Sequence, residues 1–150
     1  MHMRQLLLLL PLLIVLSSCG RDEPDDRRVI DLADEVEPGT PTFGVYNAMK
    51  AMGIPVEVGT ATSRPFFDVK GRALVVNGAE VELYEFDSKG EADEAAAKIA
   101  PDGSVAGEPA WSGPVQWYRT ELVIALYPGG DTAVTSAITT AMGPMFAGRR

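Results

Sequence analysis

RALVVNGAEVEL, residues 72–83, is the most informative segment of the 150-residue chain. The dipeptide Asn77-Gly78 at its centre favours a two-residue hairpin turn, in which both turn residues take a positive φ. Pairing Val76 with Ala79 places five apolar residues on one face, and these are Leu74, Val76, Ala79, Val81 and Leu83. Glu80 and Glu82 then share the other face with Ala73 and Val75. Because a one-residue slip would mix these two sets, the segment predicts a hairpin of fixed register.

A helix is expected after this hairpin, and a second hairpin and helix after that. Ser88 and Glu91 have the spacing of a capping box, and alanines follow at helical spacing. Residues 115–118 and 122–127 predict a second hairpin, Asp131 can cap a last helix, and Gly143-Pro144 ends it. Strand–strand–helix therefore occurs twice, at 72–100 and 115–142. Such units arise easily without duplication, so the pattern is not taken as a repeat.

The segment before the first hairpin predicts one more helix and two strands. Thr40 can cap a helix, Pro41 suits its first position and Gly53 ends it. Residues 55–59 alternate between apolar and polar and predict a short strand. Residues 60–64 are expected to form a turn or loop, and 65–69 a further edge strand.

These elements predict an α+β fold, with an antiparallel sheet and about three helices packed mainly on one face. The opposite face carries Glu80 and Glu82, so it is expected to be solvated or to meet a partner. Residues 40–150 are enough for a single small globular domain.

The N-terminus has the pattern of a secretory signal. Arg4 precedes an apolar run over 6–16, which is too short for an ordinary membrane span, and small residues precede Cys19. Leu16-Ser17-Ser18-Cys19 resembles the lipobox of bacterial lipoproteins. The resemblance implies that 1–18 is a cleaved signal peptide and that Cys19 is the lipid attachment site. It also implies an extracytoplasmic domain in the bacterial cell envelope. Gly20 after the cysteine, in place of the Asp of inner-membrane lipoproteins, favours the outer membrane where a cell has two.

Residues 19–39 are expected to be the lipidated N-terminus and a flexible acidic tether. This stretch holds eight acidic and three basic residues and few apolar ones, so it cannot bury enough surface to fold alone. In the alternative interpretation, Val29, Ile30, Leu32 and Val36 form a short helical turn that docks on the domain.

Composition excludes several classes of function. The formal charge of the chain is −8, and there is no basic cluster, so nucleic acid is not an expected partner. The only histidine, His2, lies in the signal peptide, and Cys19 is the only cysteine. Ser–His–Asp and Cys–His catalytic sites and the usual zinc sites are therefore excluded from the mature chain. We predict a non-enzymatic protein without a cofactor or metal.

Aromatic residues with an arginine are the best candidates for a contact surface, because such residues are enriched in binding hot spots. We select Arg64, Phe66 and Trp111, and assign Phe67 and Trp117 to the core. Glu80 and Glu82 are a weaker candidate for a cation site, since they point the same way on one strand. The alternative for this pair is a solvated strand face.

The segment from Leu74 onward resembles a group of small uncharacterised bacterial lipoproteins. The resemblance lies in residues 75–81 (VVNGAEV), 84–86 (YEF), 101–103 (PDG) and 126–127 (LY). Our leading hypothesis is a membrane-anchored envelope lipoprotein whose domain binds an envelope protein. The alternatives are a small-ligand or cation-binding module, and a carboxylate-based hydrolase of envelope glycans. The hydrolase would need two carboxyl groups across a cleft.

Overall fold

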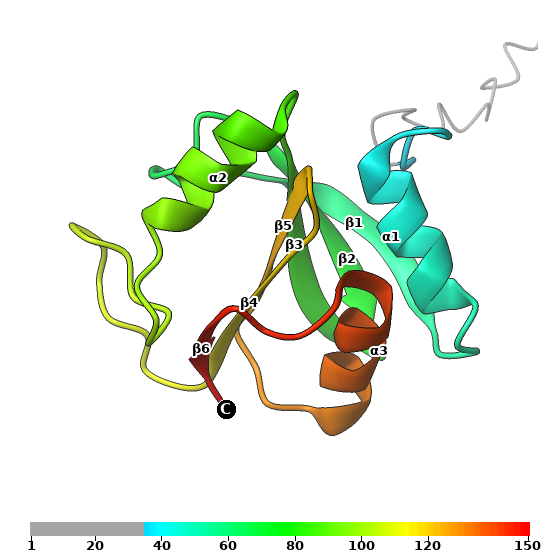
Figure 1. Ribbon diagram of the computed structural model, residues 1–150. Coiled ribbons are helices and arrows are strands. Elements are labelled where there is room, and N and C mark those ends of the chain that lie inside the picture. Colours follow the sequence, from blue (N-terminus) through cyan, green and yellow to red (C-terminus); the bar gives the residue numbers. More distant parts are fainter. Residues whose placement is uncertain (1–34) are drawn as a thin grey trace, which may run out of the picture.

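The computed structural model describes residues 35–150. The predictions for the signal peptide, for Cys19 and for most of the tether lie outside the described residues. The elements in chain order are α1 (Pro41–Lys50), β1 (Val56–Thr62), β2 (Gly71–Val76), β3 (Ala79–Glu85), α2 (Lys89–Ala97), β4 (Val115–Arg119), β5 (Val123–Tyr127), α3 (Thr132–Met142) and β6 (Ala147–Arg149). Figure 1 shows them arranged around one sheet, in the order β1-β2-β3-β5-β4-β6. All neighbouring strands are antiparallel, which confirms the α+β class.

The hairpin of β2 and β3 has the predicted register. Val76 pairs with Ala79, and Leu74 pairs with Val81. Asn77 and Gly78 take φ values of 49° and 81°, which are the positive values that the two-residue turn requires. Leu74, Val76 and Val81 are completely buried, so the register is the one that removes most apolar surface from water.

The sheet carries a hydrophobic core on each face. Helices α1 and α3 pack on one face, over the apolar side chains of β2 and β3 that the sequence predicted. Helix α2 lies on the opposite face, as Figure 1 shows, and it packs there over Tyr84, Trp117 and Leu126. Two of the three helices therefore share a face, as expected. The second face was expected to be solvated or to meet a partner; Glu80 on it is exposed, but around Glu82 and Tyr84 the face is covered from within the chain, by α2 and residues from the loops 63–70 and 98–114.

The three helices begin at the predicted residues. The side chains of Thr40, Ser88 and Asp131 each accept a hydrogen bond from a backbone N–H in the first turn of the helix that follows. These bonds satisfy donors that a helix terminus would otherwise leave unpaired.

Two local predictions were wrong, and one strand was not predicted. Residues 65–69 form turns in place of a strand, since the backbone closes a turn from Phe67 N–H to the Arg64 carbonyl and the Phe67 side chain enters the core. Strand β1 continues to Thr62, through an irregularity between Val58 and Ala61. Strand β6 was not expected, because three residues are too few to show a periodic pattern.

The two strand–strand–helix units are not related by a rotation. Strands β3 and β5 are adjacent and antiparallel, so only a two-fold axis along the sheet normal could exchange the two hairpins. That rotation would leave both helices on the same face, whereas α2 and α3 lie on opposite faces. The arrangement agrees with the view that the pattern is not an internal repeat.

Packing begins before the predicted domain boundary at residue 40. Val36 is only 9% exposed and belongs to the core beneath α1 and α3. The last residues of the predicted tether are therefore part of the domain. Within the described residues, none of the helices combines the length and the apolar character needed to cross a bilayer.

Candidate functional site

A buried ion pair ties the loop before β2 to the centre of the sheet. Glu82 on β3 is 3% exposed, and its carboxylate accepts hydrogen bonds from both Nε (2.9 Å) and Nη2 of Arg64. The Tyr84 hydroxyl donates to the same carboxylate, at 2.5 Å. We call these three residues the Arg64–Glu82–Tyr84 network. This bidentate contact fixes the position of the guanidinium and also pairs its charge.

Both hydrogen-bond donors of this network have a raised pKa. The hydrogen bond to Glu82 raises the pKa of Arg64 above its ordinary value. Burial, followed by the hydrogen bond to Glu82, raises the pKa of Tyr84 far above the usual range of a phenol. Arg64 and Tyr84 both donate to Glu82, so both oxygens of its carboxylate are engaged.

The predicted cation site at Glu80 and Glu82 is not formed. Glu82 is neither solvated nor available, because Arg64 and Tyr84 already bind both of its oxygens. Glu80 is exposed and belongs to no group that could hold a metal. The sequence did not indicate the partner of Glu82 because Arg64 reaches β3 from a loop 18 residues away.

The three predicted contact residues lie together. Arg64, Phe66 and Trp111 line one cavity of about 330 Å³, which we call the Arg64–Trp111 cavity. Its other lining residues are Val105, Glu108, Pro109, Ala110 and Ser112. All three predicted residues are partly exposed, as a contact surface requires.

Cation–π and aromatic contacts hold Trp111 in place. The Arg64 guanidinium carbon lies 5.4 Å from the centre of the Trp111 ring, within the range of a cation–π contact. The same ring packs edge-to-face on Trp117, with ring centres 6.5 Å apart. The Trp111 carbonyl accepts a hydrogen bond from Arg149. Trp111 is thus a fixed aromatic anchor at the edge of the cavity, with the buried Trp117 behind it, as predicted for the core.

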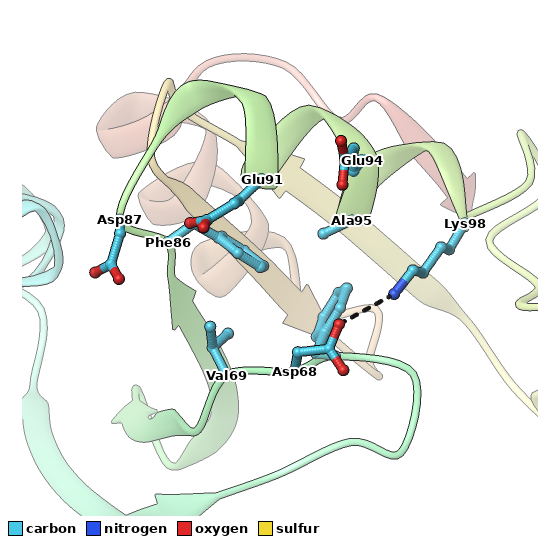
Figure 2. A pocket seen from close by; sticks show the side chains of 9 residues that line it. Asp68, Val69, Phe86, Asp87, Glu91, Glu94, Ala95 and Lys98 are labelled. Carbon is cyan, nitrogen blue, oxygen red and sulfur yellow. Dashed lines mark ion pairs between the residues drawn. The ribbon is translucent and has the colours of Figure 1, made fainter.

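A second cavity of about 310 Å³ lies between α2 and the segment that follows Phe66 (Figure 2). We call it the Phe67–Phe86 cavity, after two buried rings that line it. The remaining lining residues are Asp68, Val69, Asp87, Glu91, Glu94, Ala95 and Lys98. Lys98 donates a hydrogen bond to the Phe66 carbonyl, at 2.9 Å, and lies 3.7 Å from the Asp68 carboxylate. This site was not among those predicted from the sequence, although the spacing of Asp87, just before α2, and of Glu91 and Glu94 on α2 was its available signal.

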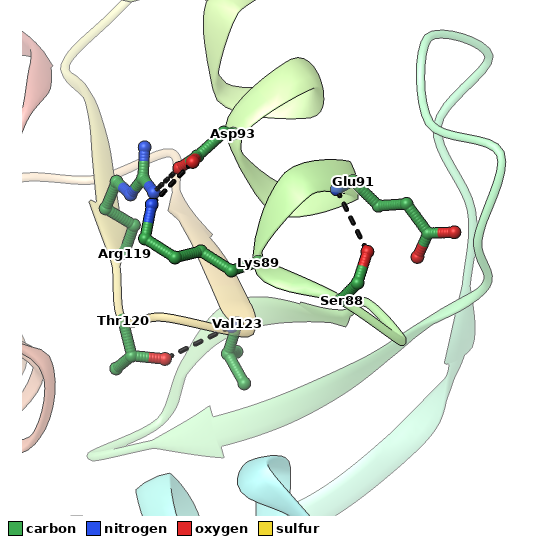
Figure 3. Close-up of polar contacts among 7 residues, drawn as sticks. All are labelled: Ser88, Lys89, Glu91, Asp93, Arg119, Thr120 and Val123. Carbon is green, nitrogen blue, oxygen red and sulfur yellow. Dashed lines mark hydrogen bonds and ion pairs between the residues drawn. The ribbon is translucent and has the colours of Figure 1, made fainter.

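The other side of α2 is anchored to the sheet by charge. Figure 3 shows Asp93 between Lys89, at 2.6 Å, and Arg119 of β4. The hydrogen bond from Lys89, and then that from Arg119, lowers the pKa of Asp93. Ser88 caps the helix by accepting from the Glu91 N–H, at 3.3 Å. Helix α2 is therefore held at its start and along the side that faces β4.

The described residues contain no group of three or more Asp, Glu, His or Cys side chains placed to hold a metal ion. Comparison of the chain with models of protein families, with curated proteins and with solved structures finds no match. The function is therefore inferred from the geometry of the two cavities and from the residues themselves.

Proposed function

We propose that this protein is a lipid-anchored lipoprotein of the bacterial cell envelope, whose domain binds an envelope protein through the Arg64–Trp111 cavity. The observation that supports the proposal most is the gathering of Arg64, Phe66 and Trp111 around one cavity. These residues were selected from the sequence by type alone and are separated by up to 47 positions.

The chemistry of this cavity suits a protein partner. Tryptophan and arginine are enriched among the residues that dominate binding energy, particularly where they are held rigidly. The Trp111 ring contacts Arg64 and Trp117, so little side-chain freedom would be lost when a partner binds, and Arg149 holds the backbone of Trp111 through its carbonyl. Glu108 and Ser112 supply polar groups at the rim, where a partner could form hydrogen bonds.

The proposed anchor rests on the lipobox resemblance at Cys19. A single acyl chain binds membranes only marginally, whereas the two or more chains of a diacylglycerol-modified cysteine anchor a protein stably. The acidic chain, with its formal charge of −8, gains nothing from anionic headgroups. Membrane association should therefore depend on the lipid.

Replacing Cys19 with serine is expected to move the protein from the membrane fraction to the soluble fraction, because the lipid has no other attachment site. The measurement is cell fractionation followed by detergent phase partition. Ser18→Ala is the matched control, since it keeps a small residue before the cysteine and should leave the protein in the membrane. A Cys19→Ser protein that still sediments with membranes would contradict the proposed anchor.

A photo-crosslinking amino acid at Ser112 is expected to capture one discrete protein in intact cells, because Ser112 lies exposed at the rim of the Arg64–Trp111 cavity. The same probe at Asn47, exposed on α1, reports non-specific neighbours. Trp111→Ala should remove the Ser112 product, whereas Met52→Ala, which truncates an exposed apolar residue of the segment after α1, should leave it unchanged. Equal products at Ser112 and Asn47, or none at Ser112, would count against this surface.

A further inference from the structure

The Phe67–Phe86 cavity has an excess of negative charge that the protein itself does not balance. Within the part of the chain that the structure describes, Asp87, Glu91 and Glu94 form no ion pair, and their carboxylates accept no hydrogen bond. The fourth carboxylate of the cavity, Asp68, is paired with Lys98. Three exposed carboxylates thus line the cavity without a partner among the described residues.

The other side of α2 differs, because its carboxylate has partners within the protein. Asp93 lies on the same helix and is bound by both Lys89 and Arg119 (Figure 3). Glu91 and Glu94 are separated by one helical turn and line the cavity together. Helix α2 therefore has one side on which Asp93 is paired by Lys89 and Arg119, and one side on which Glu91 and Glu94 are exposed and have no partner among the described residues.

Two phenyl rings form part of the wall of the cavity. Phe67 and Phe86 are 6% and 5% exposed, and their rings pack edge-to-face with centres 5.8 Å apart. A phenyl ring attracts a cation to its face and excludes water around an aliphatic chain. Aromatic walls with carboxylates around them are therefore complementary to an organic cation that carries an alkyl segment.

The cavity already holds one ammonium group of this kind. Figure 2 shows Lys98 reaching from the end of α2 toward Asp68, while Asp87 and Glu91 lie at the opposite end. Lys98 shows that one end of the cavity accommodates an alkyl chain that ends in an ammonium group. Asp87 and Glu91 have no cation beside them at the opposite end, and Glu94 lies between them and Lys98, one helical turn before it.

We propose that the Phe67–Phe86 cavity binds a small linear diamine or polyamine, with its ammonium groups on Asp87, Glu91 and Glu94 and its alkyl chain against the phenyl rings. Three unpaired carboxylates favour a ligand with two or more positive charges over a monoamine. The volume of about 310 Å³ is at the lower end for small-molecule sites, which favours a ligand of this size. The site is separate from the Arg64–Trp111 cavity and does not depend on its proposed partner.

A metal ion fits these residues less well. Calcium and magnesium require several oxygens that converge at about 2–2.6 Å from the ion. No three carboxylates of the described residues converge in this way, and phenyl rings supply no ligand. The distribution of charge along the cavity matches an extended cation better than a point charge.

The test is calorimetric titration of residues 19–150, produced without the signal peptide, with 1,5-diaminopentane. Saturable one-to-one binding is expected, with weaker binding of pentylamine and none of 1-pentanol. The double variant Glu91→Gln/Glu94→Gln should weaken binding at least about tenfold, because two charge-assisted contacts are lost. These side chains have no partner among residues 35–150, and glutamine at position 91 keeps the capping-box pattern, so the variant should remain folded.

The matched control is Glu80→Gln/Glu121→Gln, which removes the same charge from exposed positions that do not line this cavity. It should bind the diamine as the unmodified protein does. If both double variants lose affinity equally, the attraction comes from the net charge alone and the site is refuted. Binding of 1-pentanol as strong as that of the diamine, or no saturable binding of the diamine, would also overturn the proposal.

Discussion

Replacing Glu82 with alanine is expected to lower the free energy of unfolding by about 2–4 kcal/mol. The substitution leaves the buried Tyr84 hydroxyl and the Arg64 guanidinium without their shared acceptor. The Arg64 side chain is 31% exposed and can regain some water, which keeps the cost below that of a fully buried orphan charge. Urea denaturation followed by circular dichroism gives the measurement.

Glu80→Ala is the matched control for this prediction. Glu80 lies on the same strand and the same face, two residues away, but is exposed and does not pair. Its loss should change stability by no more than about 0.5 kcal/mol. If Glu80→Ala and Glu82→Ala destabilise the protein equally, the stabilising role of the Arg64–Glu82–Tyr84 network is refuted.

A double-mutant cycle with Arg64→Met separates the pair from its surroundings. Arg64→Met alone leaves the Glu82 carboxylate buried with only Tyr84 as its donor. In the double variant neither charge is orphaned, so its destabilisation should be smaller than the total of the two single variants. Strict additivity would mean that Arg64 and Glu82 do not interact.

Trp117→Ala is expected to destabilise the domain by about 3–5 kcal/mol, which is a large share of the stability of a small domain. Trp117 is completely buried, and its ring lies about 6 Å from those of Phe66 and Phe67. Its indole N–H also donates to the Gly103 carbonyl, at 3.0 Å. Truncation would leave a cavity and remove this bond, so the urea midpoint should fall strongly.

Trp111 provides the comparison for the stability loss expected of Trp117→Ala. Trp111 is partly exposed, so Trp111→Ala should destabilise the domain by about 1–2 kcal/mol and leave it folded for the crosslinking experiment. Trp117→Phe should fall between the two, since it keeps most of the packing and loses the N–H donor. Equal losses for Trp111→Ala and Trp117→Ala would contradict the assignment of Trp117 to the core and Trp111 to the surface.

Local signals in the sequence were sufficient for most of the secondary structure. The Asn77-Gly78 turn and the three helix caps each depend on residues within a few positions of one another, so the sequence contains their whole cause. The prediction for residues 65–69 was wrong. Their apolar content suggested a strand, but tertiary packing uses Phe67 to fill the core under α2.

The candidate sites also differ in how much of each the sequence predicted. Residue type alone selected Arg64, Phe66 and Trp111, and the fold placed them around one cavity. The role of Glu82 could not be predicted, because its donor comes from a distant loop. The Phe67–Phe86 cavity was also missed, since residues 67–69 and residues 86–98 meet there only in the folded chain.

The sequence by itself determined the register of the first hairpin, the residues at which the helices begin and the α+β class, because hydrophobic period, turn chemistry and capping act over short distances along the chain. Only the tertiary structure decided that α2 crosses to the face of Glu82. That placement depends on where β5 inserts beside β3, which is a contact between residues about 40 positions apart. It turns a face expected to be solvated into a second core with a buried ion pair and two cavities at its edges. The physical reason is that burial is a property of the assembled sheet, and no local pattern specifies which face a helix will cover.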